Sequence, residues 1–381
     1  MPHEMTRALA RVEGLRELKA TKAIGGKYIS RPELRRVLRE HAAREIPPEA
    51  LEHEAIVLKL IGAIPTGYPF VEKQFEILGT EIAGLYEPSD KTMYLLSDLG
   101  PREAEATLLH ELVHALQDQH FGLRTRMRYR KGNGDALAAA SALGEGDATY
   151  VMMKAVGQPP EPTALRVAMA ASAQKPDQPA FLSNALISSY VYGYEFVYTL
   201  VRDGGMTAVN QAWARAPTTS EQILHLAKWR AGEPAIEVTP PRVDHTVDSD
   251  SLGEVGLRTY LELGGSKPDA AIAASGWGGD RGSLGMDGET VRYAWHYRAD
   301  VDAPDAAARV ITALTHVFAT LAKVDEKGET PCIQRRDAGP LAATRKGNDV
   351  WLVAGPTSSR TWQSTATCDD ARKALLALVK D

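Results

Sequence analysis

The pattern of apolar and polar positions predicts a mainly helical chain with two regions of β-structure. Prolines and glycines mark several helix ends, notably Pro101 at one start and Gly122 after the end of the same helix. Apolar residues recur at helical spacing in the segments that we expect to be helical: Glu4–Arg44 (several helices), Glu49–Ile64, Pro101–His120, Asp135–Val156, Ile187–Arg202, Ala208–Arg215, Ser220–Arg230, Ala306–Lys323 and Asp369–Val379.

Strand-like patterns occur in the first half and again near the end of the chain. Glu81–Tyr86 and Thr92–Ser97 are joined by turn residues and predict a β-hairpin. Thr290–Tyr297 and Asp349–Ala354 predict further strands, beyond a proline-rich linker at Gly232–Asp250. The sequence therefore predicts an α+β protein with three parts: a helical segment at 1–48, a mainly helical domain with a small sheet at 49–250, and a smaller α+β domain at 251–381.

Composition narrows the classes of partner. The 381 residues include 44 Lys and Arg against 49 Asp and Glu, a net charge of −5, which argues against nucleic acid as the main partner. No apolar stretch is long enough to cross a membrane. No pattern indicates an oligomeric state.

The strongest chemical signal is an HExxH motif inside a predicted helix. Residues His110–His114 read His-Glu-Leu-Val-His. Positions i and i+4 of a helix project from one face, so His110 and His114 can bind one zinc ion, with Glu111 beside them as a general base. The alternative is an amphipathic helix with two partly buried histidines. The position of the motif after a hairpin favours zinc.

A catalytic zinc also needs a third protein ligand and an open position. His120 has the spacing of the metzincin signature, but Gln117 stands where that signature has glycine, so an unbroken helix would turn His120 away from the metal. Glu145 lies between two glycines in an apolar helix, where an unpaired carboxylate would be costly to bury. We expect Glu145 to be the third ligand; the alternative is a solvated glutamate near a helix kink.

These residues resemble known zinc peptidases. The pairing of HExxH with a glutamate on a second helix is similar to the gluzincins, the thermolysin-like enzymes. Several segments between about residue 50 and residue 245 also resemble a family of predicted bacterial zinc metallopeptidases: Gly84–Pro88, His110–Phe121, Glu145–Thr149, Tyr190–Val197 and Thr219–His225. The resemblance implies a zincin-like fold, a Zn²⁺ cofactor and peptide or protein substrates.

The supporting residues depart from the gluzincin pattern. Thr149 stands where those enzymes often have an aspartate that orients a ligand, which leaves Asp147 and Asp118 as candidates for that role. Peptide hydrolysis also needs a donor to the developing oxyanion. His225 and Tyr190 are our candidates, although either could be a packed or surface side chain. The basic run Arg124–Lys131 is either a solvated loop or a wall of the cleft that favours acidic substrates.

The sequence thus predicts a zinc metallopeptidase in which Glu111 moves the proton. The predicted hairpin would offer an edge strand to an extended substrate. A zinc-containing scaffold or protein-binding module with the same fold but no turnover is the alternative, and an amidase would use the same metal. Cys332 and Cys368 could form one disulfide, which would suit an oxidising compartment. An extracytoplasmic location, with the signal absent from this chain, is therefore favoured over a cytoplasmic one.

Overall fold

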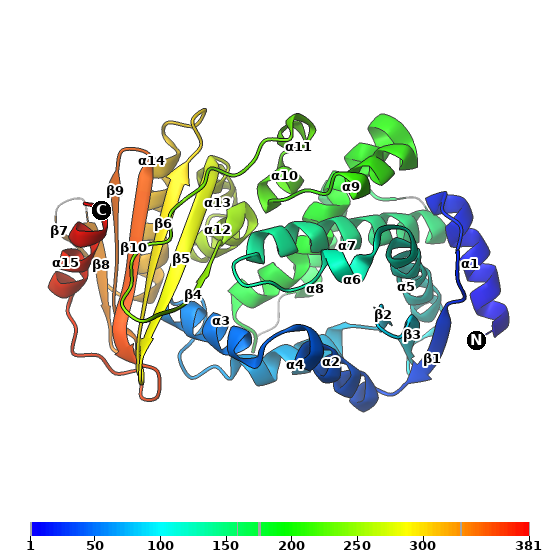
Figure 1. The fold of residues 1–381 in the computed structure, drawn as a ribbon, viewed down its shortest axis with the longest axis horizontal. Coiled ribbons are helices and arrows are strands. Elements are labelled where there is room, and N and C mark those ends of the chain that lie inside the picture. The colour runs from blue at the N-terminus through cyan, green and yellow to red at the C-terminus, as the bar shows by residue number, and fades with distance from the viewer. Residues whose placement is uncertain (1, 158, 174–176, 328–329, 381) are drawn as a thin grey trace.

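The protein is an α+β structure in which a helical half and a β-sheet half lie end to end. The computed structural model describes residues 2–157, 159–173, 177–327 and 330–380. In Figure 1 a seven-stranded sheet lies at the left, the long helices lie in the middle, and a small sheet lies near the N-terminus at the right. The predicted fold class is confirmed. Among the described residues, no helix is both long and apolar enough to cross a membrane.

The small sheet contains the predicted hairpin and one strand that the sequence pattern missed. Strands β2 (Gly84–Glu87) and β3 (Thr92–Leu96) pair antiparallel, and β1 (Gly25–Ile29) pairs parallel to β3. The expectation of helices throughout 4–44 is therefore wrong at β1. This strand forms only because β3 supplies a partner far along the chain. The sheet order β1-β3-β2 makes β2 an edge strand.

Three long helices form the centre of the helical half. Helix α5 (Pro101–Phe121) begins at the expected proline and ends before Gly122, whose φ of 69° allows the left-handed C-cap. Helix α7 (Gly134–Val156) packs along α9 (Ala180–Ala214) over most of its length. A side-chain carbon added at Gly146 would lie 2.1 Å from the Gly193 backbone. Gly146 therefore allows α7 to approach α9 closely.

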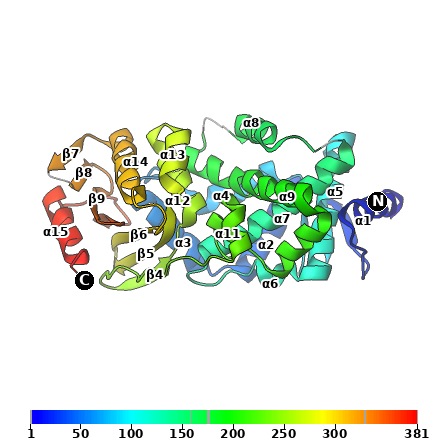
Figure 2. The same ribbon diagram turned by 90° about the horizontal axis from the view of Figure 1, so that it is seen from above.

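Shorter helices surround this centre. In Figure 2, α8 and α11 are seen on opposite sides of α9. The two helices expected within 187–215 form one element, α9, which is kinked at Gly204 and Gly205. The remaining helices of this half are α1 (Pro2–Arg16), α2 (Arg31–Glu45), α3 (Pro48–Leu60), α4 (Phe70–Glu81), α6 (Leu123–Arg126), α8 (Pro162–Ala173), α10 (Ser220–Leu224) and α11 (Leu226–Ala231).

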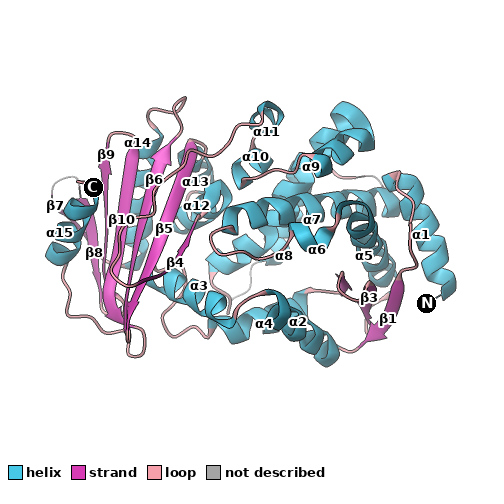
Figure 3. Cartoon of the chain, viewed as in Figure 1, coloured by secondary structure: helices cyan, strands magenta, loops and turns pink. Residues whose placement is uncertain are grey.

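The large sheet is antiparallel throughout, in the order β4-β5-β6-β10-β9-β8-β7 (Figure 3). It contains the two expected strands, as β6 and β10, and five more. The strands are β4 (Thr246–Asp250), β5 (Trp277–Asp287), β6 (Thr290–Ala299), β7 (Val324–Lys327), β8 (Thr330–Arg335), β9 (Gly339–Lys346) and β10 (Asp349–Ser358).

Helices cover both faces of the large sheet. Strand β10 alternates, with Leu352 in the core beneath α14 (Ala306–Leu321) and Val353 in the core beneath α15 (Cys368–Leu378). A disulfide joins Cys332 on β8 to Cys368 at the start of α15. Helix α12 (Gly253–Leu261), a short 3-10 helix (Glu262–Gly264) and helix α13 (Lys267–Ala274) connect β4 to β5.

The two largest hydrophobic cores lie one in each half. One lies among α5, α7 and α9 and includes Leu112, Val151 and Val197. The other lies between the large sheet and its helices, and it also includes Leu58 of α3 and Phe181 of α9. Elements from before residue 251 thus complete the core of the sheet. The domain boundaries drawn from the sequence stay predictions.

Candidate metal centre

Two helices bring three potential metal ligands together. His110 and His114 project from one face of α5, and Glu145 approaches them from α7. The two Nε2 atoms lie 3.0 Å apart, and the Glu145 Oε2 atom lies 3.2 Å from the first and 3.6 Å from the second. The structure therefore places the three predicted ligands in one cluster.

The spacing of these atoms suits a small tetrahedral ion. Zinc bonds to nitrogen and oxygen are about 2.1 Å long, so two ligand atoms in a tetrahedral site lie about 3.4 Å apart. The three observed separations, 3.0, 3.2 and 3.6 Å, bracket this value. Two imidazoles and one carboxylate are also the ligand types that zinc binds in open sites. The residues present fit a zinc ion.

A glutamine fixes one of the imidazole rings. The His114 Nδ1–H donates to the Gln117 Oε1 atom at 2.8 Å, which leaves the Nε2 lone pair free for a metal. The amide of Gln117 in turn donates to the Gly144 carbonyl and to Asp147. Asp147 also accepts from the buried Arg16 of α1. The ring orientation is thus set by a chain of hydrogen bonds that crosses three helices.

Sequence analysis missed this role of Gln117. In the sequence Gln117 stands out only as a replacement for the metzincin glycine, although its position three residues after His114 places it on the same helix face. Of the two aspartates considered, Asp147 acts through Gln117. Asp118 instead accepts from the Tyr86 hydroxyl at 3.1 Å.

The electrostatics of the cluster favour a bound cation. Burial lowers the pKa of His114, but the Glu145 carboxylate outweighs this effect and raises the pKa to about 9. Burial likewise raises the pKa of Glu145, but the charges and hydrogen bonds of His114 and His110 reverse the effect and hold it well below its usual range. A field that retains a proton between these groups also stabilises a metal cation.

Glu111 lies beside the cluster and is held by the small sheet. Its side chain is buried, and its Oε2 atom accepts the backbone N–H of Tyr86 on β2 at 2.6 Å. Burial raises its pKa, against the opposing charges of His110 and His114. A carboxylate with a raised pKa is suited to accept and return a proton near neutral pH.

Tyr190 is the expected donor that the structure does bring to the cluster. Its ring stacks on the His110 ring with the centroids 6.4 Å apart, and its hydroxyl hydrogen-bonds to Glu145. The Glu145 charge, together with burial, raises the pKa of Tyr190 well above its usual value, so the hydroxyl keeps its proton. Tyr194 is buried and donates to the Pro160 carbonyl instead.

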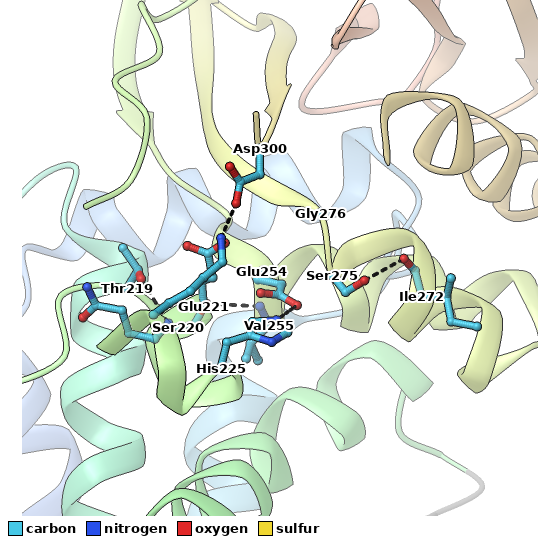
Figure 4. A network of polar contacts seen from close by, with 12 residues as sticks. Thr219, Ser220, Glu221, His225, Glu254, Val255, Ile272, Ser275, Gly276 and Asp300 are labelled. Atoms are coloured by element: carbon cyan, nitrogen blue, oxygen red, sulfur yellow. Dashed lines mark hydrogen bonds and ion pairs between the residues drawn. The ribbon is translucent and has the colours of Figure 1, made fainter. Parts of the chain in front are cut away.

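His225 belongs to another part of the molecule, which corrects its assignment to the site. The residue separates α10 from α11, and its Nε2 atom lies 2.9 Å from the Oε1 atom of Glu254 (Figure 4). It lines a different pocket, together with Tyr192 and Arg258. Because the break between the two short helices turns its ring toward α12, we remove His225 from the candidate site.

Two other candidate residues do not act on the cluster: the His120 side chain points away from it, and the charge of Arg124 is paired with a carboxylate. The His120 ring is exposed and hydrogen-bonds to the Lys19 carbonyl, as the unbroken helix predicts. Arg124, from the basic run, lines the cluster pocket but donates twice to Glu45. Arg124 therefore gives little support to the reading of this run as a wall for acidic substrates.

The cluster opens onto a pocket of about 200 Å³. Its walls come from the edge strand β2, from the end of α2 and from the segment after α5. The residues that line it include Leu85, Pro88, His41, Met127 and Tyr190, together with the cluster and Glu111. An extended ligand in this pocket would lie between the edge strand and the three ligand side chains.

A second group of potential ligands lies where α10 and the segment after α11 meet the end of β6. The carboxylates of Glu221, Glu233 and Asp300 also approach one another closely. The Lys228 ammonium group contacts all three, at 2.7 Å from Glu221 and 2.7 Å from Glu233. Figure 4 shows Glu221 and Asp300 of this group, with a dashed line at Asp300.

Comparisons with known proteins add little to this geometry. A family model described as a domain of unknown function (DUF8575) matches residues 241–364, which exclude the metal cluster. None of the curated proteins is similar to the chain. One solved structure, a "putative hydrolase with a novel fold" from Chloroflexus aurantiacus, is 16% identical and covers 61% of this chain and 89% of its own, with a TM-score of 0.35. A likeness of this size carries no argument about function.

Proposed function

We propose that the protein is a zinc-dependent hydrolase that cleaves peptide bonds. One observation carries the proposal. Two histidine nitrogens and one carboxylate oxygen lie at the spacing of a tetrahedral metal site, on the wall of a pocket that also contains a buried glutamate and an edge strand. His110, His114 and Glu145 would hold the ion.

The chain's own residues supply the remaining chemistry. A bound zinc ion would polarise the scissile carbonyl group and make a water molecule more acidic. The Glu111 carboxylate would accept a proton from the attacking water and return it to the leaving amine nitrogen. The Tyr190 hydroxyl, which keeps its proton, would donate a hydrogen bond to the carbonyl oxygen as negative charge develops there.

The edge strand β2 would align a bound peptide substrate along the pocket. Gly84, Leu85 and Tyr86 line the pocket, and β2 is paired on one side only. An extended peptide can add to such an edge through main-chain hydrogen bonds, without regard to its sequence. This arrangement favours a peptide over a smaller amide as the substrate.

A zinc-containing scaffold without turnover is the competing function. Structural zinc sites are closed by four protein ligands. Among the described residues, only three ligand side chains meet at this cluster, and the side chains of His110 and Glu145 keep 13% and 19% of their surface exposed toward solvent. A partly open site beside a buried base favours catalysis.

The test compares Glu111→Gln with the wild-type chain. We expect the variant to bind zinc in the same ratio, because Glu111 is not a ligand, and to lose peptide hydrolysis by about 1,000-fold or more, because general-base catalysis and water activation fail together. Zinc is measured by mass spectrometry, and hydrolysis with a mixture of quenched fluorescent peptides that contains every amino acid at the central positions. Glu103→Gln, at an exposed position on the same helix, is the control. Full activity in Glu111→Gln would contradict the proposed mechanism.

A further inference from the structure

A second pocket, lined by arginines, adjoins the pocket of the metal cluster. Its volume is about 520 Å³, and its walls come from the end of α2 and from the chain between Arg124 and Arg130. Glu45 and Arg124 line both spaces, so the two pockets share a wall. We call this second space the basic pocket.

The basic pocket carries more positive than negative charge. Among the described residues, four arginines and one carboxylate line it: Arg44, Arg124, Arg128, Arg130 and Glu45. Arg124 donates to Glu45 from two nitrogen atoms, at 3.0 and 2.8 Å. Arg44 donates to Glu87 at 3.2 Å. The guanidinium groups of Arg124 and Arg44 are therefore already paired with carboxylates of the chain.

The other two arginines have no such partner. The side chains of Arg128 and Arg130 are exposed and make no hydrogen bond or ion pair with the described part of the chain. The Asn133 side chain bonds to the backbone of both residues and holds their loop in place. Two unpaired guanidinium groups on an ordered loop, beside a hollow, favour the binding of an anion.

Two short stretches of chain connect the basic pocket to the metal cluster. Met127 lines the pocket of the cluster, and the next residue, Arg128, lines the basic pocket. On β2, Tyr86 holds the base Glu111, and the next residue, Glu87, is the partner of Arg44. A peptide extended along β2 rises about 3.3 Å per residue, so two or three residues cover about 7 to 10 Å from the scissile bond.

We propose that the basic pocket, if the peptidase function proposed above is correct, binds an acidic substrate side chain two or three residues from the scissile bond. The carboxylate groups of Asp and Glu side chains accept paired N–H groups from a guanidinium fork. Arg128 and Arg130 would donate these bonds, while Arg124 stays paired with Glu45 between the two pockets. The enzyme would then cleave peptides a short distance from acidic residues.

The first test measures binding without cleavage. The probes are two acetylated and amidated decapeptides of alanine and glycine, one with two central glutamates and the other with two central glutamines. They have nearly the same shape and differ in charge. Titration calorimetry on the full-length Glu111→Gln chain with zinc, at about 50 mM salt, is expected to show at least about fivefold stronger binding of the glutamate probe. The ratio is expected to fall at about 500 mM salt, because salt screens exposed ion pairs.

A matched pair of double variants locates the binding site. Addition of Arg128→Gln and Arg130→Gln is expected to bring the ratio below about twofold, because the unpaired guanidinium groups are lost. Addition of Arg7→Gln and Arg102→Gln removes the same charge at exposed positions outside the basic pocket and is expected to keep the ratio. The zinc-free wild-type chain replaces Glu111→Gln as the background if that variant does not fold.

Each outcome decides the proposal. Equal binding of the two probes, no binding of either, an unchanged ratio without Arg128 and Arg130, or an equal fall in both double variants would overturn it. Cleavage of the mixture of quenched fluorescent peptides by the wild-type chain separates this proposal from the proposed function. Charge-selective binding without hydrolysis of any peptide would leave the basic pocket standing and remove the peptidase. Hydrolysis with no preference for Asp or Glu near the cleaved bond would do the reverse.

Discussion

Two groups of side chains in this protein pass the same simple test for a metal site, yet they differ in chemistry. His110, His114 and Glu145 place three ligand atoms within 4.8 Å of one another, and so do Glu221, Glu233 and Asp300. The first group contains one carboxylate and two imidazoles, which can bind a metal in their uncharged form. The second contains three carboxylates around the ammonium group of Lys228.

The difference shows that proximity of ligand atoms does not define a metal site. In the second group the chain supplies its own cation, because the Lys228 ammonium group contacts all three carboxylates and occupies the place between them. In the first group no Lys or Arg among the described residues contacts the three ligands, and the neighbouring Gln117 directs an imidazole lone pair toward the centre. We therefore propose a metal ion for the first group only.

The strongest test of this contrast is removal of Lys228. In Lys228→Met the carboxylates of Glu221 and Asp300 lose their cation while they remain buried or nearly so. We expect the free energy of unfolding to fall by about 3 kcal/mol, because one partner of a buried ion pair is left alone. Urea unfolding measures the loss, and zinc binding by the first cluster is expected to stay unchanged.

The matched control is Lys323→Met, at an exposed position. Its free energy of unfolding is expected to change by less than about 0.5 kcal/mol. Restored stability of Lys228→Met on addition of zinc would show that the second group binds metal after all. Such a result would remove the contrast between the clusters.

The second-largest expected effect is on zinc affinity, when the residue that orients the His114 ring is removed. In Gln117→Ala the His114 ring loses its hydrogen-bond partner, and Asp147 loses one of its donors. We expect zinc affinity to fall by about 10- to 100-fold, as is typical when a residue that orients a ligand is removed. Competition with a chromogenic chelator measures the change.

Gln119→Ala provides the comparison on the same helix. Gln119 bonds to the backbone of Thr21 and Lys22 and makes no contact with the ligands. Its removal is expected to leave zinc affinity within about twofold of wild type. Equal losses in the two variants would indicate a general loosening of α5 and would refute the orienting role of Gln117.

The smallest effect uses Asp135, a buried residue near the second cluster that pairs with no Lys or Arg among the described residues. Asp135 lies in the first turn of α7 and accepts the backbone N–H of Ser220. Burial raises its pKa from 3.8 to about 7. Between these values the folded state holds a proton that the unfolded state has released, so the free energy of unfolding falls as pH rises from about 4 to 7.

Asp135→Asn keeps an oxygen acceptor and removes the ionisation. Relative to wild type, we expect the variant to gain about 1 to 2 kcal/mol of stability between pH 5 and pH 8. Urea unfolding at several pH values gives this difference directly. A difference that stays constant with pH would mean that Asp135 does not titrate in this range.

Some structural features could be predicted from the sequence because they follow from local rules. Pro101 and Gly122 mark the ends of α5, and the spacing of His110 and His114 places both rings on one face of it. Glu145 could be chosen because a carboxylate in an apolar helix needs a partner. These inferences require only neighbouring residues.

The parts that the sequence could not predict depend on contacts between distant segments. Strand β5 contains several glycines and reads as a loop, but a side chain at Gly282 would collide with the Tyr293 hydroxyl group, so the glycine serves close packing in the sheet. His225 has the residue type of a catalytic donor, but the sequence could not show that its ring contacts Glu254. Strand β1 needs its partner β3 to form.

The most direct test of the central claim is an anomalous-difference map at the zinc absorption edge, from crystals of the full-length protein grown with zinc. We expect a single peak bounded by the Nε2 atoms of His110 and His114 and by the Glu145 carboxylate, with no density of this kind beside Lys228. No peak between the two imidazoles, or a peak among Glu221, Glu233 and Asp300 alone, would contradict it.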